Sequence, residues 1–136
     1  MTTRPAPPSG RPPPVEASLE GGVPIDLVAL AEEICRRYRA EFPDEQERYG
    51  DAGIAWCLHD NQYILNWTVL ARNGYGSLER ELAWLARVLA ARDFPLERLR
   101  RNLEIAADVA RERVPDGGEP LADDLEAGAR SVPARA

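Results

Sequence analysis

Apolar residues recur at helical spacing through the middle of the chain. The stretch 54–71 has no glycine or proline, and it holds two of the three tryptophans, the single histidine and one of the two cysteines. On a helix, at about 100° per residue, its apolar side chains cover well over half the circumference. The remaining polar side is narrow and consists of Ala55, His59, Gln62 and Asn66. So wide an apolar surface predicts a buried, central helix that ends near Asn73.

The same spacing predicts three further helices. The first covers 26–42, with Asp26 as its N-cap and Pro43 ending it. A connector over 44–53 follows, with room for one helical turn, loosened by Gly50 and Gly53, and Asp51 can cap the central helix. Ser77 caps the next helix, over 78–92, and Pro95 begins another that ends at 115–118. No stretch alternates with period two, so no strand is expected.

The two ends differ in composition from the middle. Residues 1–22 contain six prolines and almost no large apolar side chain. We expect a disordered, proline-rich tail there; its segment 11–14 would suit a proline-reading groove, but a solvated tail is the preferred interpretation. Residues 23–115 form the predicted folded domain. Residues 116–136 are predicted as a flexible tail with at most one short, weak helix over 121–129.

Charge and composition exclude several classes of partner. The net charge of −6 and the pI near 4.9 argue against nucleic acid binding, and all 17 basic residues are arginine. No apolar run approaches the length of a membrane helix, and no signal peptide is recognisable. We therefore expect a cytoplasmic protein whose two cysteines, at a spacing typical of neither zinc nor redox sites, are reduced thiols.

Asp60 is the anomaly in the central helix. It falls in the apolar arc, between Trp56 and Tyr63 on one side and Cys57 and Ile64 on the other. A buried carboxylate needs a partner, because burying an unpaired charge is costly. The partner is either an arginine of another helix or a ligand that presents N–H donors.

The residues offer no catalytic or metal-binding motif. A single histidine leaves no cluster of the usual zinc or di-iron kind, and no glycine-rich phosphate loop is present. His59 and Asp60 are adjacent in sequence, which places them on different faces of a helix. We expect a non-enzymatic protein without a metal.

The stretch 57–65 reads C-L-H-D-N-Q-Y-I-L. It resembles the bilin-attachment helix of phycobiliproteins, C-[LI]-R-D-x-x-Y-x-L-R. The resemblance covers about residues 27–113, because the helix before Pro43, the turn at Asn73 and Gly74, and the pair Phe94 and Pro95 also resemble family features. It implies an all-α, globin-like (phycobiliprotein-like) fold. It also implies a bilin cofactor, a linear tetrapyrrole.

The resemblance implies roles for particular residues. Cys57 would form a thioether to the bilin, Asp60 would accept hydrogen bonds from pyrrole N–H groups, and His59 stands where the family has an arginine. The aromatic residues Trp56, Tyr63 and Trp67 would line the flat ligand. Because the family's N-terminal helical hairpin has no counterpart, the chain is more similar to small globins that accompany bilin-synthesis enzymes in non-photosynthetic bacteria. Those enzymes are then the expected partners.

Other interpretations stay open. Cys57 also fits a small core thiol, which is the bland alternative to an anchor. The pattern is similar, too, to helical domains joined to cobalamin-binding sensor modules, which would make this a ligand-free regulatory or protein-interaction domain. Histidine-ligated haem is disfavoured because 78–92 holds no histidine. Trp84 and Val88 mark either a homodimer surface or core packing.

Overall fold

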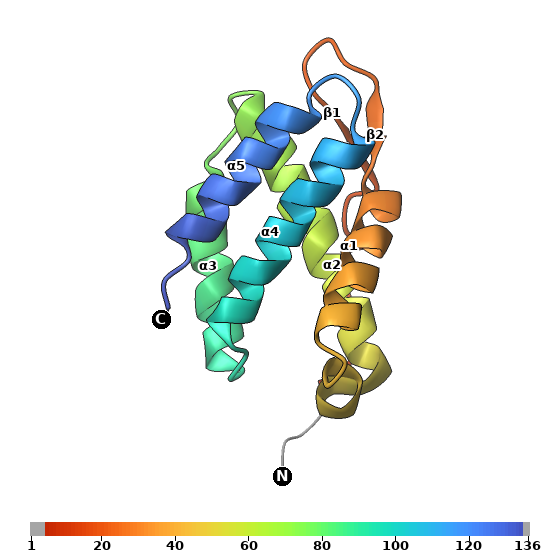
Figure 1. Cartoon of the computed structure of the whole chain (residues 1–136), viewed down its shortest axis with the longest axis vertical. Helices are drawn as coiled ribbons and strands as arrows, with labels where there is room; N and C mark the ends of the chain where they lie inside the picture. Colours follow the sequence, from red (N-terminus) through yellow and green to blue (C-terminus); the bar gives the residue numbers. More distant parts are fainter. Residues whose placement is uncertain (1–4, 135–136) are drawn as a thin grey trace.

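The computed structural model describes residues 5–134, and helices dominate it (Figure 1). This confirms the predicted all-α class, to which a small hairpin is added. In chain order the elements are β1 Glu16–Ser18, β2 Pro24–Asp26, α1 Leu27–Glu41, α2 Glu45–Arg72, α3 Leu78–Ala91, α4 Leu96–Arg113 and α5 Gly118–Ser131.

α4 is the most deeply buried helix. It lies between α1 and α5 in Figure 1, with α2 behind it, and it also contacts α3. Nine of its 18 residues are buried, against eight of 28 in α2. The prediction that 54–71 is a buried central helix is therefore only half right, because Trp56, Tyr63 and Trp67 of α2 are only half-buried.

Local sequence signals place most helix ends correctly. The side chain of Asp26 accepts a hydrogen bond from the backbone N–H of Ala29 at 3.0 Å, and that of Ser77 accepts from Arg80 at 3.2 Å. Both are N-caps as predicted. α4 begins at Leu96, so Pro95 is its N-cap, whereas the sequence predicts Pro95 as the first helical residue. Among the described residues, no helix is both long and apolar enough to span a membrane.

The predicted connector 44–53 is mostly helical. α2 already begins at Glu45 and is interrupted only at Gly50, whose φ of 67° and ψ of −160° are not helical. Glycine adopts such a conformation without a Cβ clash, so the helix bends there and resumes. The first turn of α2 is joined to α4 by an ion pair between Glu45 and Arg98, at 2.7 Å between carboxylate and guanidinium, which the local sequence does not reveal. Asp51 lies inside the helix and accepts from the side chain of Gln46.

The C-terminal segment is a core helix and not a weak one. Four side chains of α5 are buried, namely Leu121, Ala122, Leu125 and Ala129. At Gly128 a Cβ would come within 2.7 Å of Leu82, so glycine permits the close approach of α3. The expectation of a flexible tail is thus contradicted for the described part of 116–136, because small residues give α5 a core face that looks weak in sequence.

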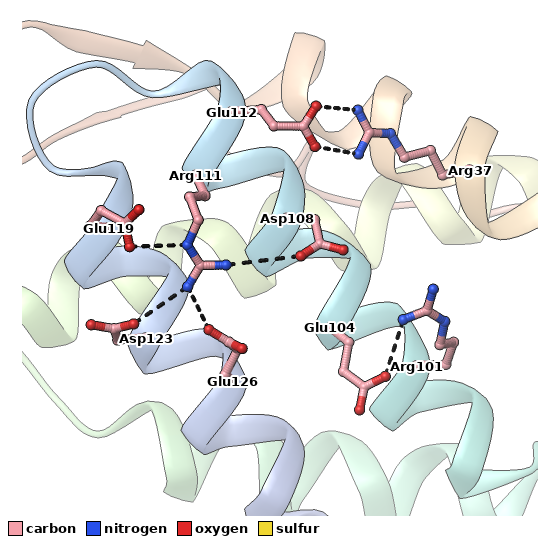
Figure 2. Close-up of polar contacts among 9 residues, drawn as sticks. All are labelled: Arg37, Arg101, Glu104, Asp108, Arg111, Glu112, Glu119, Asp123 and Glu126. Atoms are coloured by element: carbon pink, nitrogen blue, oxygen red, sulfur yellow. Dashed lines mark hydrogen bonds and ion pairs between the residues drawn. The ribbon is translucent and has the colours of Figure 1, made fainter.

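Arginine clusters join the helices at the surface (Figure 2). Arg111 of α4 lies within 3.0 Å of Glu119, 3.4 Å of Asp123 and 2.6 Å of Glu126, all on α5. Arg37 of α1 binds Glu112 of α4 through two hydrogen bonds of 2.7 and 3.1 Å. Two-point pairing fixes the relative orientation of the helices that carry it.

The N-terminal segment contains a strand, which contradicts the expectation of none. β1 pairs antiparallel with β2, with Ala17 opposite Ile25. Residues 5–22 also contact α2: Ser18 accepts a hydrogen bond from the side chain of Asn73 at 2.9 Å. The described part of the predicted disordered tail 1–22 therefore has defined contacts. Strands this short carry too little alternation for the sequence to signal them.

Candidate functional site

A cavity of about 870 Å³ lies between the helices and the N-terminal segment. Ligand sites in proteins have about 300–1,000 Å³. Its wall contains side chains of α1, α2, α3 and α4, the turn after α3 and the described N-terminal residues. The lining residues used below are Ala6, Tyr38, Trp56, Cys57, Asp60, Asn61, Arg92 and Asn102.

The six predicted site residues fall on two sides of α2. Trp56, Cys57 and Asp60 line the cavity. His59, Tyr63 and Trp67 are not among the lining residues. They form an aromatic row along α2, with ring centroids 5.0 Å apart for His59 and Tyr63 and 6.0 Å apart for Tyr63 and Trp67. Positions four apart share one helix face, so the row runs along the helix, and at its N-terminal end the ring of His59 lies 5.0 Å from that of Trp56 at the cavity wall.

Asp60 lies at the cavity wall with His59 as its partner. Its Oδ1 is 3.1 Å from Nδ1 of His59, so the two adjacent side chains meet, contrary to the expectation of different faces. No ion pair joins Asp60 to an arginine in the described part of the chain. Burial raises the pKa of Asp60, and this effect exceeds the opposing hydrogen bond of His59 and the charge of Arg92.

Cys57 belongs to a pair of thiols between α1 and α2. The amide nitrogen of Asn61 is 3.5 Å from Sγ of Cys57 and 3.7 Å from Sγ of Cys35. The hydrogen bond with Cys35, and then burial, raise the pKa of Cys57 well above its ordinary value. The thiol is therefore protonated at neutral pH and is a poor nucleophile. The sequence missed this pair because its members lie on different helices.

Asn61 and Asn102 form a reciprocal amide pair in the cavity wall. Nδ2 of Asn61 donates to Oδ1 of Asn102 at 3.1 Å, and Nδ2 of Asn102 donates back to Oδ1 of Asn61 at 2.9 Å. Both side chains are buried. A buried amide is tolerated when its hydrogen bonds are satisfied, so the pair fixes α2 against α4 beside the cavity. Nothing in the local sequence of either residue predicts the pairing.

Two further side chains give the cavity polar groups that sequence reasoning missed. Tyr38 is 3% exposed, and its hydroxyl has no hydrogen-bond partner among the described residues. Burial and the nearby carboxylate of Glu45 raise its pKa, which keeps it a neutral donor and acceptor. The guanidinium of Arg92 lies 5.0 Å from the ring centroid of Trp56, and within the described range it pairs with no carboxylate.

The cavity wall combines an apolar surface with several polar groups that can contact a ligand. The cavity presents an indole ring, a neutral hydroxyl, an arginine and three carboxylate residues, Glu45, Asp60 and Asp93, of which Glu45 is paired with Arg98, while its thiol is protonated. In residues 5–134, no three His, Cys, Asp or Glu side chains are grouped to hold a metal ion. Such a wall suits a flat, largely apolar ligand with N–H donors and an acidic group. Comparisons with known protein families, with curated proteins and with solved structures found no match for this chain.

Proposed function

We propose that this protein is a non-enzymatic tetrapyrrole-binding or tetrapyrrole-handling protein that holds a bilin in the cavity beside α2. The observation that carries the proposal is Asp60, a carboxylate in the wall of a cavity of about 870 Å³ with no arginine partner in the described chain. A carboxylate accepts two N–H hydrogen bonds at once, which matches the pyrrole N–H groups of a bilin. The globin-like fold implied by the resemblance belongs to the same proposal.

Other residues of the wall match the remaining chemistry of a bilin. Trp56 offers a flat apolar surface to the conjugated rings. Arg92 is a cation at the same wall and suits a propionate carboxylate. Tyr38 lines the same wall, and its buried hydroxyl, which lacks a geometrically defined hydrogen-bond partner among the described residues, suits a lactam carbonyl. Together they supply apolar contact, charge and a neutral polar group for one ligand.

The raised pKa of the Cys57 thiol favours non-covalent over covalent binding of the bilin. Cys57 lines the cavity, but its raised pKa leaves little thiolate to attack a vinyl carbon. The proposed direct contacts are thus Trp56, Asp60, Arg92 and Tyr38, and Cys57 is a wall residue. His59, Tyr63 and Trp67 do not line the cavity and are not proposed as direct contacts. His59 would position Asp60 through the contact between their side chains.

Co-expression with a bilin-producing pathway tests the proposal. We expect the purified protein to show a visible absorption band from bound bilin. On a denaturing gel the pigment should separate from the chain. Colour that stays with the denatured chain would overturn non-covalent binding, and a colourless protein would overturn the proposal itself. Asp60→Asn should lower the amount of bound pigment. Asp108→Asn is the matched control, because Asp108 lies on α4 with an exposed side chain.

A ligand-free interaction domain is the second candidate. It is favoured by Trp84, half of which is exposed on α3, and whose ring centroid lies 6.3 Å from that of Trp67. Aromatic side chains are enriched in protein interfaces. Under this alternative the aromatic row would contact a partner, such as a bilin-synthesis enzyme or a second copy of the chain. Trp84→Ala would then reduce complex formation and leave pigment binding unchanged.

A further inference from the structure

The N-terminal segment follows α2 for much of its length. We name residues 5–20 the N-terminal arm. Two side chains of α2 and its C-cap hold the arm in order along the helix: Trp56 donates to the carbonyl of Ala6 at 2.6 Å, Gln62 to that of Pro14 at 3.1 Å, and the C-cap Asn73 to that of Ser18 at 2.9 Å. The arm therefore runs parallel to α2, and its beginning reaches the cavity.

The two halves of the arm are held differently. From Pro14 onward it has several anchors: Gln62, itself buried, the bond from Leu27 N–H to the carbonyl of Val15 at 3.0 Å, and the β1–β2 pair. Before Gly10, the hydrogen bond from Trp56 to Ala6 is the single one found among the described residues. The first half is thus the part that opens at lower free-energy cost.

The chain between the two halves has slack. Ala6 and Pro14 are eight residues apart, enough to span about 27 Å when extended. Their partners Trp56 and Gln62 are six residues apart on the helix, about 9 Å along its axis. The chain bends between these two points at Gly10, whose φ of +87° is left-handed. A Cβ placed there meets no atom within 4 Å, so a substitution at Gly10 strains the backbone without causing a steric clash.

Residues of the first half form part of the cavity wall, namely Pro5, Ala6, Pro7 and Ser9. Prolines suit this position because they lack an N–H that would need a partner and lose little entropy when ordered. The carbonyl that accepts the hydrogen bond from Trp56 is that of Ala6, which lies between Pro5 and Pro7.

We propose that residues 5–9 form a lid over the cavity, with Gly10 as its hinge and the hydrogen bond from Trp56 to Ala6 as its latch. Opening the latch exposes the cavity, including Cys57, and closing it covers a bound ligand. The ligand part of this proposal rests on the proposed function, whereas the lid itself exists without a ligand. Trp56 then has two roles: its ring lines the cavity, and its indole N–H holds the lid through Ala6.

Labelling of Cys57 in the ligand-free, full-length protein tests the lid. On a Cys35→Ala background, Cys57 is the single thiol, and its rate of reaction with an aromatic disulfide reagent reports access to the cavity. Gly10→Ala forces a side chain into a left-handed conformation, so labelling should accelerate on the order of tenfold. Trp56→Phe keeps a ring but removes the donor, and it should accelerate labelling by a similar factor.

Gly76→Ala is the matched control. Gly76 has a φ of +98° with nothing within 4 Å of its Cβ position, as at Gly10, but it lies in the turn before α3. We expect no acceleration there. Two results would overturn the proposed lid. One is an equal labelling rate of Cys57 with and without Gly10→Ala, and the other is an equal acceleration in Gly10→Ala and Gly76→Ala. If labelling behaves as expected and bilin does not bind, the proposed function fails and the lid stands.

Discussion

Oδ1 of Asp60 lies 3.1 Å from Nδ1 of His59, and this contact does not compensate for the burial of the carboxylate, because the pKa of Asp60 remains raised. Compared with the unfolded chain, the folded protein therefore favours the protonated form of Asp60 over the charged form. Asp60 contributes stability at pH values below the ordinary carboxyl range and loses it as the pH rises through the folded pKa. We predict that Asp60→Asn, which cannot ionise, raises the melting temperature of the ligand-free protein at pH 7.

The pH series supplies the check on that prediction. Thermal unfolding of the wild type and of Asp60→Asn should differ at pH 7 and converge in acid, where both side chains are neutral. Asp108→Asn should show no such pattern, because Asp108 is exposed. A lower melting temperature for Asp60→Asn at pH 7 would mean that the carboxylate makes a stabilising ion pair, and the ligand role would lose its support.

The Asn61–Asn102 pair should be strongly coupled. Asn102→Leu leaves the buried Oδ1 of Asn61 without its donor, while Nδ2 keeps the carbonyl of Cys57, at a cost of about 1–3 kcal/mol in the free energy of unfolding. Replacing both by leucine removes both polar groups and should recover much of that loss. A double-mutant cycle measured by urea unfolding gives the coupling. Additive losses would show that the two amides do not depend on each other.

α5 should behave as part of the core. Leu125 is fully buried, so Leu125→Ala should lower the free energy of unfolding by about 2–5 kcal/mol. Leu70→Ala, at a position on α2 that is 38% exposed, is the control and should cost much less. Equal, small effects in urea unfolding would mean that 118–131 is a tail, as the sequence alone predicted.

Arg111 should stabilise α5 through charge. It is the cation shared by Glu119, Asp123 and Glu126, which would repel one another without it (Figure 2). Arg111→Met should lower the melting temperature, and the difference should shrink at high salt, because salt screens surface charges. Arg130→Met, on α5, is the control. A loss that does not depend on salt would assign the effect to packing of the arginine stem.

The sequence predicts what is determined locally. Asp26 and Ser77 are caps because a short polar side chain before an apolar stripe satisfies the first N–H groups of a helix. The core stripe of α1, from Leu27 to Tyr38, follows from helical spacing alone. Cys57, Asp60 and Trp56 were placed at a binding site by a resemblance and an unusual carboxylate, and the structure brings them to one cavity.

The remainder depends on contacts between distant residues. Asn61 meets Asn102 and Cys57 meets Cys35 only because α2 packs against α4 and α1. Helical periodicity shows which residues share a face of a helix but not what that face packs against. It therefore predicts a buried aromatic face on α2, whereas Tyr63 and Trp67 are only half-buried. The N-terminal arm is proline-rich and reads as disordered, yet side chains of α2 some 50 residues away hold it, 50 for Ala6 and 48 for Pro14.

The most direct test of the central claim is a titration of the purified full-length protein with a linear tetrapyrrole, followed by absorption. We predict a saturable, single-site change in the bilin spectrum, with affinity reduced on the order of tenfold in Asp60→Asn, the effect of weakening one charged hydrogen bond. Asp108→Asn should bind like the wild type. A spectrum that does not saturate, or equal affinity in the wild type and in Asp60→Asn, would contradict the claim that the cavity beside α2 binds a bilin through Asp60.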